Sequence, residues 1–149
     1  MNIEFYDQKG NVNANLFDTK AQEIAKKFIM KNIIFNKKKQ KNEEKVVGVS
    51  RHQLRKIFDE VKRLEKILEE KNNWDDIYPL IKLIKSKVAY STARARKNDK
   101  KSANYYSNLS DFIKTSIDKI NTKKDYNVFC LLFEAVYGFY YELGGSSTN

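Results

Sequence analysis

The chain has 149 residues, which is the length of a single domain. One cysteine and one histidine exclude a disulfide framework, a cysteine-based zinc or iron–sulfur site and a multi-histidine metal centre. The formal net charge of +10 favours a negatively charged partner. Only one proline and five glycines are present, which disfavours a β-sandwich or barrel, because such folds need many turn residues.

No stretch approaches the roughly 20 apolar residues of a membrane helix, and the first residues lack a signal-peptide pattern, so we expect a cytoplasmic protein. The charge is unevenly distributed. Residues 82–101 carry eight basic side chains, whereas residues 125–149 carry three acidic and no basic ones. This asymmetry predicts a basic binding end and an apolar packing end. The alternative is that the basic residues, mostly lysine, only solvate exposed helix faces.

The expected elements begin at residue 18, after a loosely ordered arm over residues 1–17 that shows no sustained period. Asp18 or Thr19 caps a first short helix, whose apolar positions continue at helical spacing as far as Ile29. Residues 36–49 begin with a lysine-rich run that has no apolar side chain, and we expect a basic linker loop there.

Four longer helices are expected after this loop. Ser50 and Gln53 form a capping box at the start of the second helix. Apolar residues at helical spacing predict three more, over residues 76–98, 103–121 and 126–143. Asp125 is the expected cap of the last one. The prediction is an all-α, single-domain bundle of about five helices over residues 18–145, followed by a disordered tail at 146–149.

Catalytic motifs are absent from the sequence. It contains no glycine-rich phosphate loop, no nucleophile elbow and no zinc-protease motif. His52 has no partner at a fixed spacing and is expected on the surface, and Cys130 lies in the most apolar segment, where it is expected in the core. Glu134 is expected to pair with a cation of the bundle. We therefore expect no enzyme, no cofactor and no metal site.

The chemistry that remains is binding of a nucleic-acid backbone by long basic side chains on helix flanks. The candidate RNA-binding residues lie along the second and third helices: Arg51, Arg55, Lys62, Lys87, Arg94 and Arg96. Lys87 and Arg94 are two helical turns apart and share a stripe with Leu83 and Tyr90. The alternative is that these two cations pair with Glu134 or Asp111 and stabilise the fold.

The last helix is apolar nearly all round, which is typical of a central helix or of one that also faces a second protein. Its large side chains are therefore expected either in the bundle core or at a subunit contact. They are Phe129, Phe133, Tyr137 and Tyr140.

Four segments in order carry a family resemblance: AQEIAKKFI, then SRHQLRKIFDEVKRLE, then KSKVAYSTARAR, then FEAVYGFYYELGG. The sharpest matches are KVAY at 87–90 followed by Arg94, and FEA at 133–135 followed by Tyr137. Over about residues 19–145 the chain resembles the small helical subunit of type III-A (Csm-type) CRISPR effector complexes. Gly138 departs from the pattern, since the family tends to carry alanine there.

The resemblance implies a non-catalytic, RNA-contacting structural subunit of a ribonucleoprotein that contributes to antiviral defence. Such subunits lie in several copies along the duplex of guide RNA and target RNA. The implied partners are these RNAs, the large polymerase-like subunit, the backbone subunits and copies of the chain itself. Lys87, Arg94 and Arg55 are the cations that match the family; Arg51, Lys62 and Arg96 come from helical position and charge alone.

Two other functions stay open from the sequence. One is a helical DNA-binding regulator whose Ser50 helix enters a major groove; it is disfavoured because no short glycine-containing turn precedes a recognition helix. The other is a small metal-independent ribonuclease using His52, which is disfavoured because a general acid and base cannot both be identified.

Overall fold

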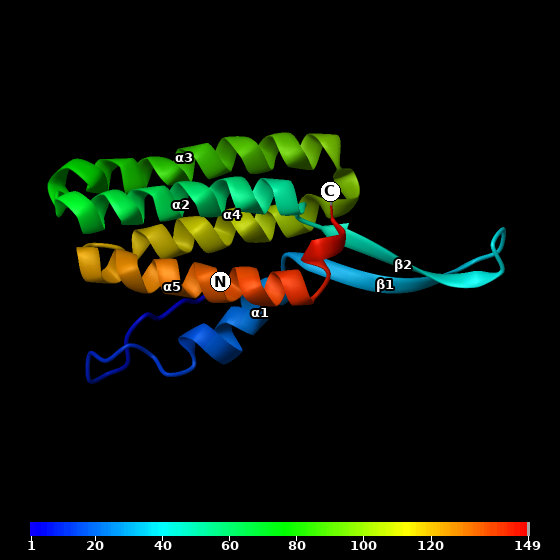
Figure 1. Cartoon of the computed structure of the whole chain (residues 1–149), viewed down its shortest axis with the longest axis horizontal. Helices are drawn as coiled ribbons and strands as arrows, with labels where there is room; N and C mark the ends of the chain where they lie inside the picture. The colour runs from blue at the N-terminus through cyan, green and yellow to red at the C-terminus, as the bar shows by residue number, and fades with distance from the viewer. Residues whose placement is uncertain (149) are drawn as a thin grey trace.

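The computed structural model describes residues 1–148 and shows a helical bundle from which a two-stranded sheet projects (Figure 1). The α-helices and strands are α1 (Ala21–Lys26), β1 (Ile29–Asn36), β2 (Lys41–Gly48), α2 (Arg51–Lys71), α3 (Trp74–Asn98), α4 (Ala103–Asp118) and α5 (Lys123–Glu142). Short π or 3₁₀ turns complete the chain: η1 (Leu16–Lys20), η2 (Lys100–Ser102) and η3 (Gly145–Ser147). Among residues 1–148, no helix combines the length and the apolar character that crossing a membrane requires.

The all-α prediction is correct for the bundle and incomplete for the segment after α1. That helix ends at Lys26, and Ile29 begins an antiparallel hairpin in which β1 pairs with β2 from Ile29↔Gly48 to Asn36↔Lys41. The expected linker loop at 36–49 is therefore mostly strand β2. Only the tip, 37–40, is a turn. The prediction missed the hairpin because most of its side chains are exposed on both faces, so no buried period of two marks it in the sequence.

The helix termini follow local hydrogen bonding. The hydroxyl of Ser50 accepts the backbone N–H of Gln53 at 3.2 Å, as its capping position predicts. The last helix begins three residues earlier than expected, because Thr122 and Asp125 form a reciprocal capping box. Asp125 is thus the third residue of α5 and not its cap. Its carboxylate also accepts the Tyr6 hydroxyl at 2.6 Å, and these hydrogen bonds lower the pKa of Asp125 despite its burial.

The N-terminal segment, expected as a loose arm, packs against the bundle. Ile3, Phe5 and Leu16 are buried in the common core. The amino group of Met1 lies 3.3 Å from the carboxylate of Asp111 in α4. Apolar burial, the ion pair between Met1 and Asp111, and the hydrogen bond from Tyr6 to Asp125 hold the segment in place.

The core is centred on α5, which contacts α1, α2 and α4. Phe129 and Phe133 are fully buried, and the ring of Phe112 from α4 lies 6.1 and 5.6 Å from theirs. The ring of Phe58 from α2 lies 5.3 Å from that of Phe133. Phe133 therefore joins three helices.

Replacing Phe133 with serine should destabilise the fold by about 3–5 kcal/mol, because it removes a fully buried ring and leaves a hydroxyl in its place. Urea denaturation followed by circular dichroism measures this loss. Leu131→Ser on the exposed side of the same helix is the control and should cost far less. A folded Phe133→Ser variant as stable as this control would show that the core is not centred there.

Gly48 ends the hairpin in a conformation that a side chain would not tolerate. Its φ is +145°, and a Cβ there would meet the carbonyl oxygen of Phe28, the same oxygen that accepts the N–H of Val49 at 2.8 Å. The N–H of Gly48 donates to the hydroxyl of Ser102 at 3.1 Å. Because it has no side chain, Gly48 lets the backbone pass close to Phe28 where the hairpin leads into α2.

Replacing Gly48 with alanine should cost about 2 kcal/mol or more, because both the backbone angle and the contact with Phe28 are unfavourable. Chemical denaturation measures the loss. In the control Gly10→Ala, φ is also positive, at +81°, but the added Cβ meets nothing within 4 Å, so about 1–2 kcal/mol is expected. Equal losses would contradict the role of the close approach.

Candidate nucleic-acid interface

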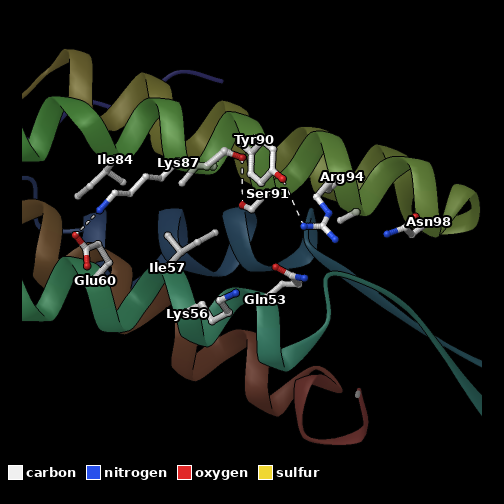
Figure 2. A pocket seen from close by; sticks show the side chains of 12 residues that line it. Gln53, Lys56, Ile57, Glu60, Ile84, Lys87, Tyr90, Ser91, Arg94 and Asn98 are labelled. Carbon is white, nitrogen blue, oxygen red and sulfur yellow. Dashed lines mark hydrogen bonds and ion pairs between the residues drawn. The ribbon is translucent and has the colours of Figure 1, made fainter.

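An open groove of about 540 Å³ runs between α2 and α3 (Figure 2). Residues of both helices line it, and the polar and charged ones among them are Gln53, Lys56, Glu60, Lys87, Tyr90, Ser91, Arg94 and Asn98. Its floor is apolar: Ile57, Ile84 and Val88 are buried there. The groove is thus a shallow apolar trough with polar and basic walls.

The wall on α3 is a row of residues three or four positions apart, so that they share one face of the helix. In this row the Tyr90 ring is 66% exposed, and Lys87 and Arg94 lie one turn to either side of it. The guanidinium of Arg94 lies 5.9 Å from the ring centroid of Tyr90, and its Nη1 donates to the phenol oxygen at 3.4 Å. Arg94 therefore contacts Tyr90 on its own helix and has no carboxylate partner among residues 1–148.

Glu60 of α2 is the acidic residue of the groove, and two cations bind it. Arg63 donates to its carboxylate at 2.8 and 3.1 Å, and the Nζ of Lys87 donates at 3.0 Å. The hydrogen bond from Arg63, together with that from Lys87, lowers the pKa of Glu60 to about 2, although partial burial opposes the shift. The pair between Glu60 and Lys87 also ties α2 to α3 across the groove.

The groove is therefore basic overall. Lys56, Lys87 and Arg94 contribute three positive charges and Glu60 one negative charge. Lys56 is exposed and forms no ion pair within the described chain. Cations on both walls of an open trough can hold the phosphates of a nucleic-acid strand, and this arrangement carries no donor or acceptor set that would select a base sequence.

The structure brings only two of the six expected cations into this groove, Lys87 and Arg94. Lys62 pairs with Glu65 at 2.6 Å and lies on the flank of α2 that faces α5; the hydrogen bond to Glu65 and, to a smaller extent, the negative charge of Glu134 raise the pKa of Lys62. The Nη1 of Arg96 donates to Ser107 of α4 at 3.0 Å. Arg51 and Arg55 are exposed near the start of α2, outside the groove.

Sequence reasoning missed Lys56 as a member of the site. It lies on the flank of α2 opposite to Arg55, and the helical wheel alone gives no reason to prefer the flank that faces α3. The sequence predicts correctly that Tyr90 shares a helix face with Lys87 and Arg94, but the predicted binding residues do not include Tyr90. Its position between two matched cations is the signal that could have selected it.

The alternative pairing of the two α3 cations with Glu134 or Asp111 is not found. Asp111 binds the amino group of Met1, and Lys87 binds Glu60. The structural role of Lys87 is therefore real but has a different partner from the expected ones. Glu134 is exposed on α5 and forms no close ion pair within residues 1–148, so the expected pair with a bundle cation is not found, although its negative charge acts on the nearby Lys62.

His52 and Cys130 are the two other side chains that the sequence analysis considered for chemistry. His52 is exposed. Cys130 is buried, and this burial raises the pKa of its thiol. Within residues 1–148 no cluster of three or more potential metal ligands is found.

The four large residues expected at the core or at a subunit contact lie mostly in the core. Phe129, Phe133 and Tyr140 are fully buried, and Tyr137 is partly buried with its ring 4.9 Å from that of Phe58. The outer face of α5 is formed by other residues.

The Glu60 cluster should make stability depend on pH. The pKa of Glu60 is about 2 in the folded protein and 4.5 in the unfolded chain. The contribution of the Glu60 carboxylate to the free energy of unfolding is therefore full above pH 4.5 and disappears as the pH falls through 2. The Glu60→Gln variant should therefore be about 1 kcal/mol less stable than the wild type at pH 7 and equal to it near pH 2.

Thermal melts across this pH range test the prediction. Glu69→Gln removes an exposed carboxylate of the same helix that has no ion pair within residues 1–148, and it should leave the pH profile unchanged. A constant difference between wild type and Glu60→Gln from pH 7 to pH 2 would contradict the assignment.

Comparison with known proteins identifies the family of the chain. A family model described as Csm2 Type III-A matches residues 11–145. No curated protein and no solved structure matches the chain.

Proposed function

Because the chain belongs to the Csm2 family of type III-A CRISPR effector subunits, we propose that it is a non-catalytic structural subunit that contacts RNA through the groove between α2 and α3. In this proposal several copies line the duplex of guide RNA and target RNA within a Csm complex and thereby contribute to antiviral defence. The neighbours are the large polymerase-like subunit, the backbone subunits and further copies of this chain.

The observation that supports RNA contact is the row formed by Lys87, Tyr90 and Arg94, which faces Lys56 across an open trough (Figure 2). Lys87 and Arg94 are seven residues apart, or roughly 10 Å along the helix axis, so they contact different phosphates of one strand. The exposed ring between them can stack on a base where the strand is unpaired, because every base has an aromatic face. Binding in this mode is indifferent to sequence and weakens as salt rises.

The experiment replaces Lys56 and Arg94 together with alanine in the assembled complex. Neither residue forms an ion pair within the described chain, so the melting temperature of the subunit should stay unchanged. Target-RNA binding should weaken, and the slope of log K against log salt should become smaller by roughly 1.4 to 1.8, since two phosphate contacts are lost. Fluorescence anisotropy over a salt series measures both quantities.

The matched control is Lys26→Ala with Lys114→Ala, which removes the same charge from exposed positions outside the groove. It should leave the salt slope at the wild-type value. If the groove variant and this control weaken binding equally, RNA is attracted by the net charge of the chain and not by the groove. If neither changes binding, the subunit does not contact RNA through these residues.

A further inference from the structure

The β1–β2 hairpin leaves the bundle at one end and projects beyond it (Figure 1). The groove between α2 and α3 ends where the hairpin begins. On the α2 side, Gln53 lines this end of the groove, only a few positions after the hairpin residue Gly48. On the α3 side, Asn98 lines it, and the hydroxyl of Ser102 just beyond accepts the N–H of Gly48 at 3.1 Å. The base of the hairpin and this end of the groove are therefore neighbours.

The hairpin is strongly basic, and its two faces differ in charge. With its turn it contains six lysines and two glutamates. Because residues opposed in the strand register share a face, Lys31 and Glu44 lie on the face that also carries Ile33 and Phe35. The charged groups of Lys31 and Glu44 are 3.1 Å apart. This face is therefore neutral overall.

The opposite face of the hairpin, here called the lysine face, carries Lys41, Glu43 and Lys45 along β2. The carboxylate of Glu43 is already bound, because Lys39 from the turn lies 3.1 Å away and Asn36 donates to it at 2.9 Å. Lys41 and Lys45 are exposed and form no ion pair within residues 1–148. The lysine face therefore keeps two positive charges that no carboxylate of the described chain binds.

The tip and the base of the hairpin add to this positive charge. At the tip, Lys37 and Lys38 are exposed and form no ion pair in the part of the chain that is described. At the base, η2 contacts β2 and contributes Lys100 and Lys101, which are also exposed and outside any ion pair of residues 1–148. Residues 94–101, which lead into this contact, carry five basic side chains and one acidic one. The positive charge therefore extends from the base of the hairpin to its tip.

The spacing of these lysines suits a partner with many regularly placed negative charges. Each strand has eight residues. At about 3.3 Å per residue the hairpin is about 26 Å long, and Lys41 lies about 13 Å from Lys45 along β2. Lysines so far apart cannot share one acidic group. The phosphate backbone of a nucleic acid supplies negative charge along its whole length, whereas an acidic protein would need carboxylates at matching positions.

We propose that the lysine face and the tip of the hairpin bind the phosphate backbone of RNA, as an arm that extends the contact beyond the groove between α2 and α3. The inference rests on the proposed function in that RNA is the partner, but it does not require that the groove itself binds. Because lysine contacts a phosphate as a point charge, the arm reads no base sequence.

The test replaces Lys41 and Lys45 with glutamine in the purified full chain. Both side chains are exposed and unpaired within residues 1–148, so the melting temperature should stay unchanged. Fluorescence anisotropy with a labelled RNA duplex over a salt series should show weaker binding. The slope of log K against log salt should become smaller by roughly 1.4 to 1.8, since two phosphate contacts are lost. Adding Lys37→Gln and Lys38→Gln should double this change.

The matched control is Lys26→Gln with Lys114→Gln, which removes the same charge from exposed positions outside the hairpin and should keep the slope of the wild type. Equal slopes in this control and the hairpin variant, or a wild type that does not bind the duplex at low salt, would overturn the proposal. Lys56→Ala with Arg94→Ala in the same assay separates the two sites. If only this groove variant lowers the slope, the arm is wrong and the proposed function stands; if only the hairpin variant does, the groove is wrong and the arm stands.

Acetylation of lysines in the wild type, with and without the RNA duplex, gives a second measurement that needs no substitution. RNA should protect Lys41 and Lys45 and should leave the labelling of Lys31, on the opposite face, unchanged. Equal protection of all three, or no protection of Lys41 and Lys45, would contradict binding through the lysine face. An acidic protein is the occupant if the hairpin variant fails to enter a Csm complex while its salt slope with RNA equals that of the wild type, and the proposal is then wrong.

Discussion

Burial of α5 is the constraint on which the rest of the structure depends. Two tyrosines come with this helix into the core, and each phenol must find a hydrogen-bond acceptor there. Tyr126 donates to the carbonyl of Val61 in α2, and Tyr140 donates to the carbonyl of Val49, both at 2.6 Å. Burial raises the pKa of the Tyr140 hydroxyl to about 12, so this hydroxyl stays protonated and uncharged in the core. These bonds hold α5 near both of its ends, against the middle of α2 at Val61 and against the segment that leads into α2 at Val49.

The position of α2 decides where charge can gather on the surface. One flank of α2 is occupied by α5. There Lys62 forms an ion pair with Glu65 and lies near Glu134, and these carboxylates offset its positive charge. The other flank faces α3 and stays open as a groove. In this groove, cations from α2 and α3 therefore face each other. Burial of an apolar helix thus sets the geometry of a charged surface that it does not touch.

The sequence predicted the bundle well because its helices bury regular apolar stripes, as in α2, where Leu54, Val61 and Leu64 are fully buried. It could not predict the hairpin, in which Ile33 and Phe35 are exposed, since burial is the cause of periodicity. For the groove, the spacing of Lys87 and Arg94 was sufficient to place them on one face. The sequence could not predict that Lys56 and Glu60 belong to the groove, because pairing across helices depends on how α2 is rotated about its axis.

The pair between Lys87 and Glu60 has a consequence for the energetics of an arriving phosphate. The ions whose release makes affinity depend on salt are cations condensed on the nucleic acid, and Lys87 displaces one of them when it contacts a phosphate. Lys87 must, however, give up Glu60, which stays behind bound by Arg63. Its gain in free energy is therefore the difference between two partners. The salt slope counts Lys87 in full, whereas the affinity at a given salt concentration includes only that difference.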